Sequence, residues 1–178
     1  PMTTLPWLHE LNGDFDQGRW CWSIPPAEMP GPANLMTADN WHDHVPYGPL
    51  VRPQADHLRN QFDALLAKYG YIREGARYRL EPQVRRLPAA FGASDRPQTW
   101  SGVRVVLVCH GGLILTLLGS VLNWPVPSVY SHLSCNTASM TRLVWLEYGG
   151  YAAPRALVLN DTSHLAGLSR DSTAAAST

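Results

Sequence analysis

The chain has 178 residues, of which 45% are hydrophobic and 16% are charged, so it can bury the core of one domain and is not expected to form two. Its 14 Lys and Arg residues balance 14 Asp and Glu residues, and a neutral chain lacks the basic surface that nucleic acid or an anionic membrane requires. We therefore predict a single domain over residues 1–170, a disordered tail over residues 171–178, and neither a nucleic-acid nor a membrane partner.

The three cysteines, Cys21, Cys109 and Cys135, stand at unrelated spacings and form neither a disulfide framework nor a zinc motif. An odd number of cysteines without such a pattern is typical of a reducing compartment. The first residues also carry no basic segment followed by an apolar one, so they do not read as a secretory signal. These features predict a cytoplasmic protein.

The first 49 residues show little periodicity and scatter Trp7, Trp20, Trp22 and Trp41 among several prolines. Flexible linkers contain few tryptophans, because each large ring left in water forfeits about 2–3 kcal/mol of burial free energy. Long ordered loops inside compact domains usually serve as lids or binding segments. We expect such a segment here.

Two elements follow this segment. Residues 50–69 carry apolar side chains three and four positions apart, which predicts an amphipathic helix that ends at Gly70. Residues 71–87 mix arginines with aromatic and aliphatic side chains, which indicates a solvated strand or the edge of a hairpin.

Residues 103–122 read VRVVLVCHGGLILTLLGSVL, about the length of a membrane span, but a glycine pair and two polar residues interrupt the run. The β-branched part, residues 103–109, predicts a strand buried on both faces, and the part after the glycine pair predicts a helix. A strand, a turn and a helix in this order favour a parallel α/β sheet. Further strands are expected over residues 141–148 and 156–159.

The residue with the most informative position is His110, which stands where the predicted strand ends and Gly111 and Gly112 open the helix. Ligands of open α/β sheets bind beyond the carboxyl ends of the strands, and the first amides of a helix are unpaired donors for an anion. A histidine at this place could contact a phosphate or carboxylate and donate a proton.

Three motifs in these residues resemble one known family. VVLVCHGGLILTLLGSVL, SCNTASMTRLVWLE and VLNDTSHL, in this order, are similar to the C-terminal half of the histidine phosphatase superfamily, the phosphoglycerate-mutase-like proteins. The resemblance implies a three-layer α/β/α domain with a mainly parallel sheet, in which His110 matches the family's second catalytic histidine. It extends more weakly to Leu8-His9-Glu10 and the glycines that follow, which implies that Glu10 is the proton donor.

The sequence departs from this family in one respect. The family's first strand ends in Arg-His-Gly, whose histidine becomes phosphorylated, and no Arg-His-Gly occurs in these 178 residues. Without an attacking imidazole the phosphohistidine mechanism has no first step. The domain is therefore interpreted as N-terminally truncated: a fragment, a chain completed by a partner, or a shortened member with other chemistry. An uncovered strand edge beside His110 would favour a homodimer.

The function predicted from these residues is that of a degenerate member of this superfamily, an enzyme that acts on a small molecule without a cofactor or metal. His110 and Glu10 are the catalytic candidates for non-covalent acid/base chemistry of the isomerase, lyase or cyclase type. Two alternatives stay open: a phosphatase or phosphomutase completed by a missing segment, and a non-catalytic ligand-binding protein. The expected partner is a small-molecule substrate that can carry a phosphate or a carboxylate, bound by the following residues: Gly111, Gly112, His9, Arg19 and Asn136.

Two further groups carry weaker alternatives. Trp41-His42-Asp43-His44, with His57 further on, could hold a metal ion, but a proline-rich loop that packs its histidines against aromatic rings explains the segment better. Cys109 adjoins His110, yet the alternation of side chains along a strand sends the two residues to opposite faces, which argues against a Cys–His nucleophile.

Overall fold

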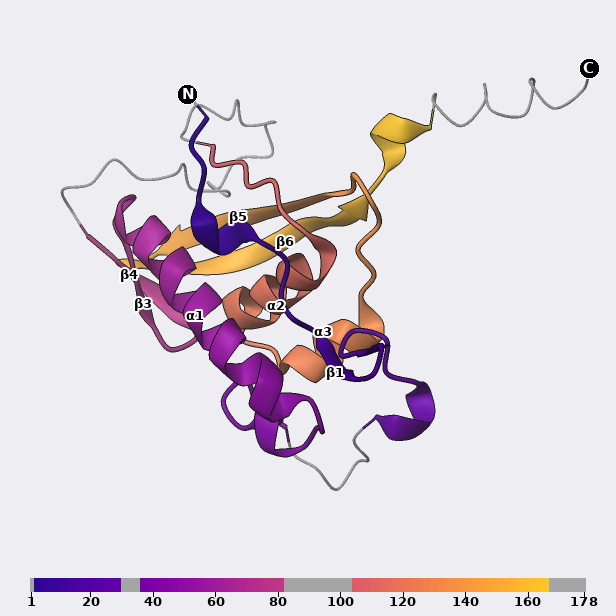
Figure 1. Cartoon of the computed structure of the whole chain (residues 1–178). Coiled ribbons are helices and arrows are strands. Elements are labelled where there is room, and N and C mark those ends of the chain that lie inside the picture. The colour runs from indigo at the N-terminus through magenta and orange to yellow at the C-terminus, as the bar shows by residue number, and fades with distance from the viewer. Residues whose placement is uncertain (1, 30–35, 82–103, 167–178) are drawn as a thin grey trace, which may run out of the picture.

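A computed structural model describes residues 2–29, 36–81 and 104–166 (Figure 1). Three α-helices are assigned in these residues: α1 (Gly48–Ala67), α2 (Gly111–Leu122) and α3 (Val126–His132). The strands are β1 (Asp14–Asp16), β2 (Arg19–Trp20), β3 (Tyr71–Glu74), β4 (Arg77–Leu80), β5 (Met140–Tyr148) and β6 (Tyr151–Asp161). Short 3-10 turns cover Pro6–Leu8, Pro26–Glu28, Trp41–Asp43 and Ser163–Leu165.

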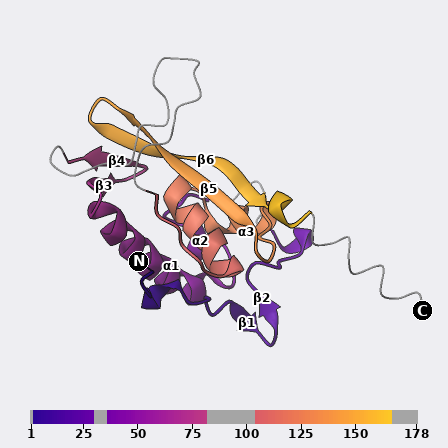
Figure 2. The ribbon, with the colours of Figure 1, turned by 90° about the horizontal axis from the view of Figure 1, so that it is seen from above.

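The main sheet has four strands in the order β3-β4-β6-β5, and every neighbouring pair is antiparallel. Gly149 and Gly150 join β5 to β6 with φ angles of 58° and 80°, the left-handed conformation that a two-residue hairpin turn requires. The three helices lie on one side of this sheet, and the β5–β6 pair passes over α2 (Figures 1 and 2). The small β1–β2 hairpin lies apart from the main sheet, beside α3.

The predicted mainly parallel, three-layer α/β/α fold is therefore wrong: the described residues form two antiparallel sheets with helices against one of them. Residues 104–110 explain the error. They form no strand, and none of their backbone groups pairs with a strand in the described part of the chain. Leu107 and Cys109 pack against the core, whereas Val106 and Val108 are 81% and 87% exposed. Composition predicted a buried strand here, but composition does not say whether a neighbouring strand exists.

Helix α1 confirms the predicted amphipathic helix. It begins two residues earlier than expected, with Pro49 in its first turn, where a missing N–H costs nothing. Its buried side chains follow the 3-4 spacing of the sequence pattern: Val51, Ala55, Leu58, Phe62 and Leu66. Gly70, with φ 82°, ends the turn after the helix and donates its N–H to the carbonyl of Ala67 at 3.0 Å.

The arginine-rich hairpin is also confirmed, as β3 and β4. Along β4 the arginines Arg77 and Arg79 are exposed and alternate with buried Tyr78 and Leu80. Tyr71, Tyr78 and Trp145 form an aromatic cluster between the sheet and the helices, with ring centroids about 6 Å apart. Residues 82–87 of the predicted segment, and the predicted tail over residues 171–178, lie outside the described residues.

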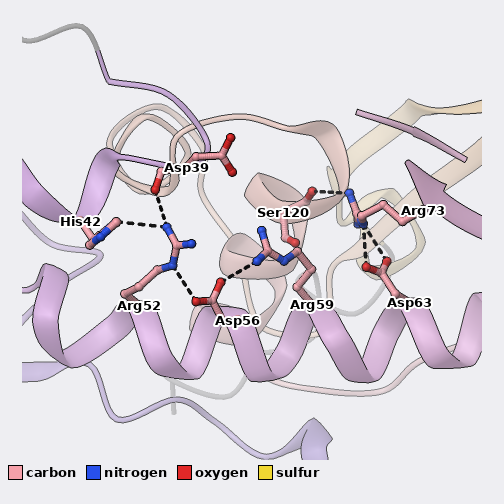
Figure 3. A network of polar contacts seen from close by, with 8 residues as sticks. All are labelled: Asp39, His42, Arg52, Asp56, Arg59, Asp63, Arg73 and Ser120. Carbon is pink, nitrogen blue, oxygen red and sulfur yellow. Dashed lines mark hydrogen bonds and ion pairs between the residues drawn. The ribbon is translucent and has the colours of Figure 1, made fainter. Parts of the chain in front are cut away.

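A row of ion pairs fixes α1 against its neighbours (Figure 3). Arg52 donates to Asp56 at 2.7 Å and to the carbonyl of Asp39 at 2.5 Å, which holds the loop before the helix. Further along, Asp63 accepts two bonds from the Nε atom of Arg73, whose Nη1 atom donates to the carbonyl of Ser120 at 3.2 Å. Through Arg73, the sheet is tied to both α1 and α2.

Among the described residues, no helix combines the length and the apolar composition that crossing a bilayer would take.

Candidate functional site

The carboxylate of Glu10 lies at the N-terminus of α2. Its Oε1 atom accepts hydrogen bonds from the amides of Leu11 at 3.0 Å and Leu113 at 2.9 Å, and its Oε2 atom accepts one from the amide of Gly112 at 3.2 Å. The helix begins with Gly-Gly, and the side chain of His110 at the N-cap position forms no capping bond. Glu10 supplies this cap from about 100 residues away, and its negative charge faces the positive end of the helix dipole.

Glycine is required where Glu10 meets the helix. A Cβ atom on Gly112 would lie 2.5 Å from the ring of Trp22 and 2.9 Å from Oε1 of Glu10, distances that real side chains do not adopt. A Cβ atom on Gly13 would lie 2.3 Å from the same ring. The two glycines therefore let Trp22 pack directly against the start of α2. Gly111 is less constrained, since its nearest neighbour would be Cys135 at 3.7 Å.

A cavity of about 430 Å³ opens beside this contact. Its walls are Glu10, Trp22, the first turns of α2 and residues 130–135. The volume lies in the range of small-molecule sites. A second hollow of about 260 Å³ shares residues 132–134 with it.

Behind the cavity wall lies a buried polar chain. The hydroxyl of Tyr130 lies 2.6 Å from that of Thr116, which donates to the carbonyl of Gly112 at 2.8 Å. Burial raises the pKa of Tyr130 well above its usual value and raises the pKa of the neighbouring Cys21 thiol to about 12. Both groups are therefore neutral at physiological pH, and they are suited to positioning rather than proton transfer.

His132, the last residue of α3, also lines the cavity. Its Nδ1 atom lies 2.8 Å from the carbonyl oxygen of Ser128. A carbonyl only accepts, so Nδ1 carries the proton and, in the neutral imidazole, Nε2 is left as an acceptor. His132 is not among the site residues predicted from the sequence. One signal in the sequence could have pointed to His132. It stands four residues after Ser128, in the last turn of a short helix, where a histidine stabilises the helix end.

Of the predicted site residues, Glu10, Gly111 and Gly112 line the cavity together. His110 is exposed at the N-cap of α2, where its carbonyl accepts the amide of Ile114 at 2.9 Å, and it is not among the described residues of the cavity wall. The first amides of α2 were predicted to be free donors for an anion. Two of them, those of Gly112 and Leu113, donate to Glu10 instead. The catalytic role of His110 stays a prediction.

The three remaining candidates lie outside the described cavity wall. His9 is exposed, with its Nδ1 atom 2.8 Å from the carbonyl of Glu10. Arg19 pairs with Asp16 and Glu28, and the amide of Asn136 donates to the side chain of Asn160 at 2.7 Å. The contacts of His9 and Arg19 are local in the sequence, whereas that of Asn136 is made by its backbone and joins it to the end of β6.

The arrangement around Cys109 agrees with the argument against a Cys–His nucleophile. The thiol packs against a cluster of Leu11, Leu58 and Leu113, while the neighbouring His110 is exposed. Burial, together with the nearby Cys135 thiol, raises the pKa of Cys109 to about 11. A thiol with such a pKa is a poor nucleophile at neutral pH.

The histidine-rich loop shows the packing that was preferred over a metal site. Trp41 is 2% exposed and meets the ring of His42 edge to face, with centroids 5.9 Å apart. The Nδ1 atom of His42 lies 3.1 Å from Nη1 of Arg52 and accepts a hydrogen bond from it (Figure 3). A nitrogen that faces a guanidinium is poorly placed for a cation, and no cluster of three ligand residues occurs in the described ranges.

Comparisons of the chain with family models, with curated proteins and with solved structures gave no match.

Proposed function

We propose that the cavity at the N-terminus of α2 is the active site of an enzyme that acts on a small molecule by non-covalent acid/base chemistry. The observation that carries the proposal is that a fixed carboxylate, Glu10, and an imidazole with a defined tautomer, His132, line the same cavity. A general base beside an orienting carboxylate suits isomerisation, elimination or cyclisation, and none of these reactions needs a phosphorylated histidine.

The hydrogen bonds of Glu10 and His132 suggest a different role for each side chain. Glu10 is held by three amides, so its carboxylate stays in place while a substrate binds. His132 donates through Nδ1 to Ser128 and keeps Nε2 as the atom that can take up a proton. In this proposal His132 is the base, Glu10 orients the substrate, and the indole of Trp22 forms one wall of the site.

The test is a screen of small molecules for turnover, with NMR as the detection method. The original chain is compared with one variant at His132 and one control variant at His164. His132→Gln should lower kcat at least about a hundredfold, the usual contribution of a general base, while the matched His164→Gln variant, in an exposed 3-10 turn, should leave it unchanged. Equal loss in both variants, or no loss in either, would reject the catalytic role of His132.

One observation favours a second candidate, a ligand-binding protein without catalysis. The carboxylate of Glu10 is largely occupied by backbone amides, as a structural cap would be. In that case His132→Gln would weaken ligand affinity and no turnover would be found with any ligand that binds.

The histidine phosphatase resemblance and a site completed by a missing segment or partner chain remain proposals. Release of phosphate from a panel of phosphate monoesters, lost in His110→Ala, would support them over the acid/base chemistry. Cytoplasmic location is likewise proposed, and it is supported by the three cysteines, which are free thiols.

A further inference from the structure

The charges around the cavity bear on which ligands it accepts. The described residues of its wall include one carboxylate, Glu10, one imidazole, His132, and neither lysine nor arginine. The arginine nearest in sequence to Trp22, Arg19, is exposed and pairs with Asp16 and Glu28. A site for phosphate or carboxylate normally places at least one such cation against the anion.

The helix N-terminus does not replace that cation. It contributes roughly half a positive charge, and the carboxylate bound to its amides contributes a full negative one, so their sum is about −0.5. Two of the amides that would hold an anion, those of Gly112 and Leu113, already donate to Glu10. A second anion at this place would meet a like charge, and these two amides would not be available to it.

The carboxylate of Glu10 can accept a further hydrogen bond from a ligand. Among the described residues, Oε1 of Glu10 accepts two amides and Oε2 accepts one, that of Gly112, which leaves Oε2 a lone pair for a further hydrogen bond within this part of the chain. The indole of Trp22 stacks on Trp20 at 5.2 Å and lies in the cavity wall beside the carboxylate. A carboxylate next to an aromatic ring is the combination that binds an ammonium group.

From these contacts we infer that the cavity selects a small cationic amine and not a phosphorylated or carboxylated molecule, with Glu10 as the residue that sets this preference. This inference rests on the proposed function, because it assigns the ligand class of the same site. It goes against the anionic substrate that the sequence resemblance implied.

The experiment compares four probes of similar size by calorimetric titration of the full chain: benzylamine, benzyl alcohol, benzoate and phenyl phosphate. Benzylamine should bind about tenfold more tightly than benzyl alcohol, and both anions more weakly than the alcohol. Glu10→Gln keeps an oxygen that accepts the helix amides and should bring the amine and the alcohol to similar affinities. Glu74→Gln, an exposed carboxylate on β3 that pairs with Arg79, is the matched control and should keep the preference.

If Glu10→Gln does not fold, the salt dependence of the original chain decides the question, since binding of the amine should weaken with added salt and that of the alcohol should not. Tighter binding of either anion, equal affinities for all four probes, or no binding of any of them overturns the inference. Amine preference without any turnover refutes the proposed enzymatic function alone, and turnover of an anionic substrate refutes the ligand class alone.

Discussion

The contact between Glu10 and α2 gives the most direct test of the folded structure around the site. Replacing Glu10 by alanine removes the acceptor of three amides, those of Leu11, Gly112 and Leu113. Loss of an N-cap side chain costs about 1 kcal/mol, and a partly buried amide left without a partner adds about 1 kcal/mol. Because two helix amides are affected in addition to the charge at the helix dipole, we expect Glu10→Ala to lower the free energy of unfolding by about 2–3 kcal/mol.

Urea denaturation followed by far-ultraviolet circular dichroism measures this loss, as a fall in the midpoint at constant slope. Glu10→Gln keeps a neutral acceptor, so it should lose about 1 kcal/mol, less than the alanine variant. Glu74→Ala removes an exposed carboxylate that pairs with Arg79 and should change stability by less than about 0.5 kcal/mol. A Glu10→Ala variant as stable as Glu74→Ala would refute the capping role.

Three other changes test neighbouring parts of the account. Gly112→Ala should destabilise the chain by about 1–3 kcal/mol in the same assay, because its Cβ atom collides with Trp22, and an unchanged midpoint would contradict that packing. Asp63→Asn leaves the guanidinium of Arg73, only 15% exposed, without its carboxylate and should cost about 3 kcal/mol, whereas a neutral result would mean that water replaces the contact. Cys109 should react with iodoacetamide at pH 8 roughly two hundredfold more slowly than a free cysteine. Its reaction rate should rise with pH up to about 11, as the thiol ionises. A rate like that of free cysteine would show that the thiol is not buried.

The predicted homodimer can be tested on residues 104–110. Val106 and Val108 are exposed and apolar, and the segment has no strand partner in the described ranges. If a second copy covers it, light scattering should give twice the mass of one chain, and Val106→Lys should return the mass to that of a monomer. A monomeric original chain would reject the dimer.

Local patterns in the sequence were sufficient for the elements that depend on near neighbours. The spacing of apolar residues fixed the buried face of α1, and the alternation of arginine with Tyr78 and Leu80 identified the β3–β4 hairpin. The fold class could not be read in this way, because it depends on whether residues 104–110 meet another strand. That is a question of distant pairing, which composition leaves undetermined.

The site likewise combines features that local sequence patterns reveal with contacts between distant residues that they do not. Glu10 was found through a family motif, but its contact with Gly112 and Leu113 joins positions 102 and 103 residues apart, and no local pattern encodes such a contact. His132 was missed because the short helix α3, with Pro125 before it and Pro127 in its first turn, has too few residues to show a period. Its role follows from the carbonyl of Ser128 and from the cavity, which only the folded chain brings together.

The proposed function requires that the cavity between Glu10, Trp22 and residues 130–135 binds a small molecule. A titration of the ¹⁵N-labelled chain with benzylamine, followed by amide chemical shifts, tests it most directly. If benzylamine binds in this cavity, the largest changes in amide chemical shift fall on Gly111, Gly112 and residues 130–135. Glu10→Gln should reduce these changes. Shifts that centre on another part of the chain, or none at saturating probe, would contradict it.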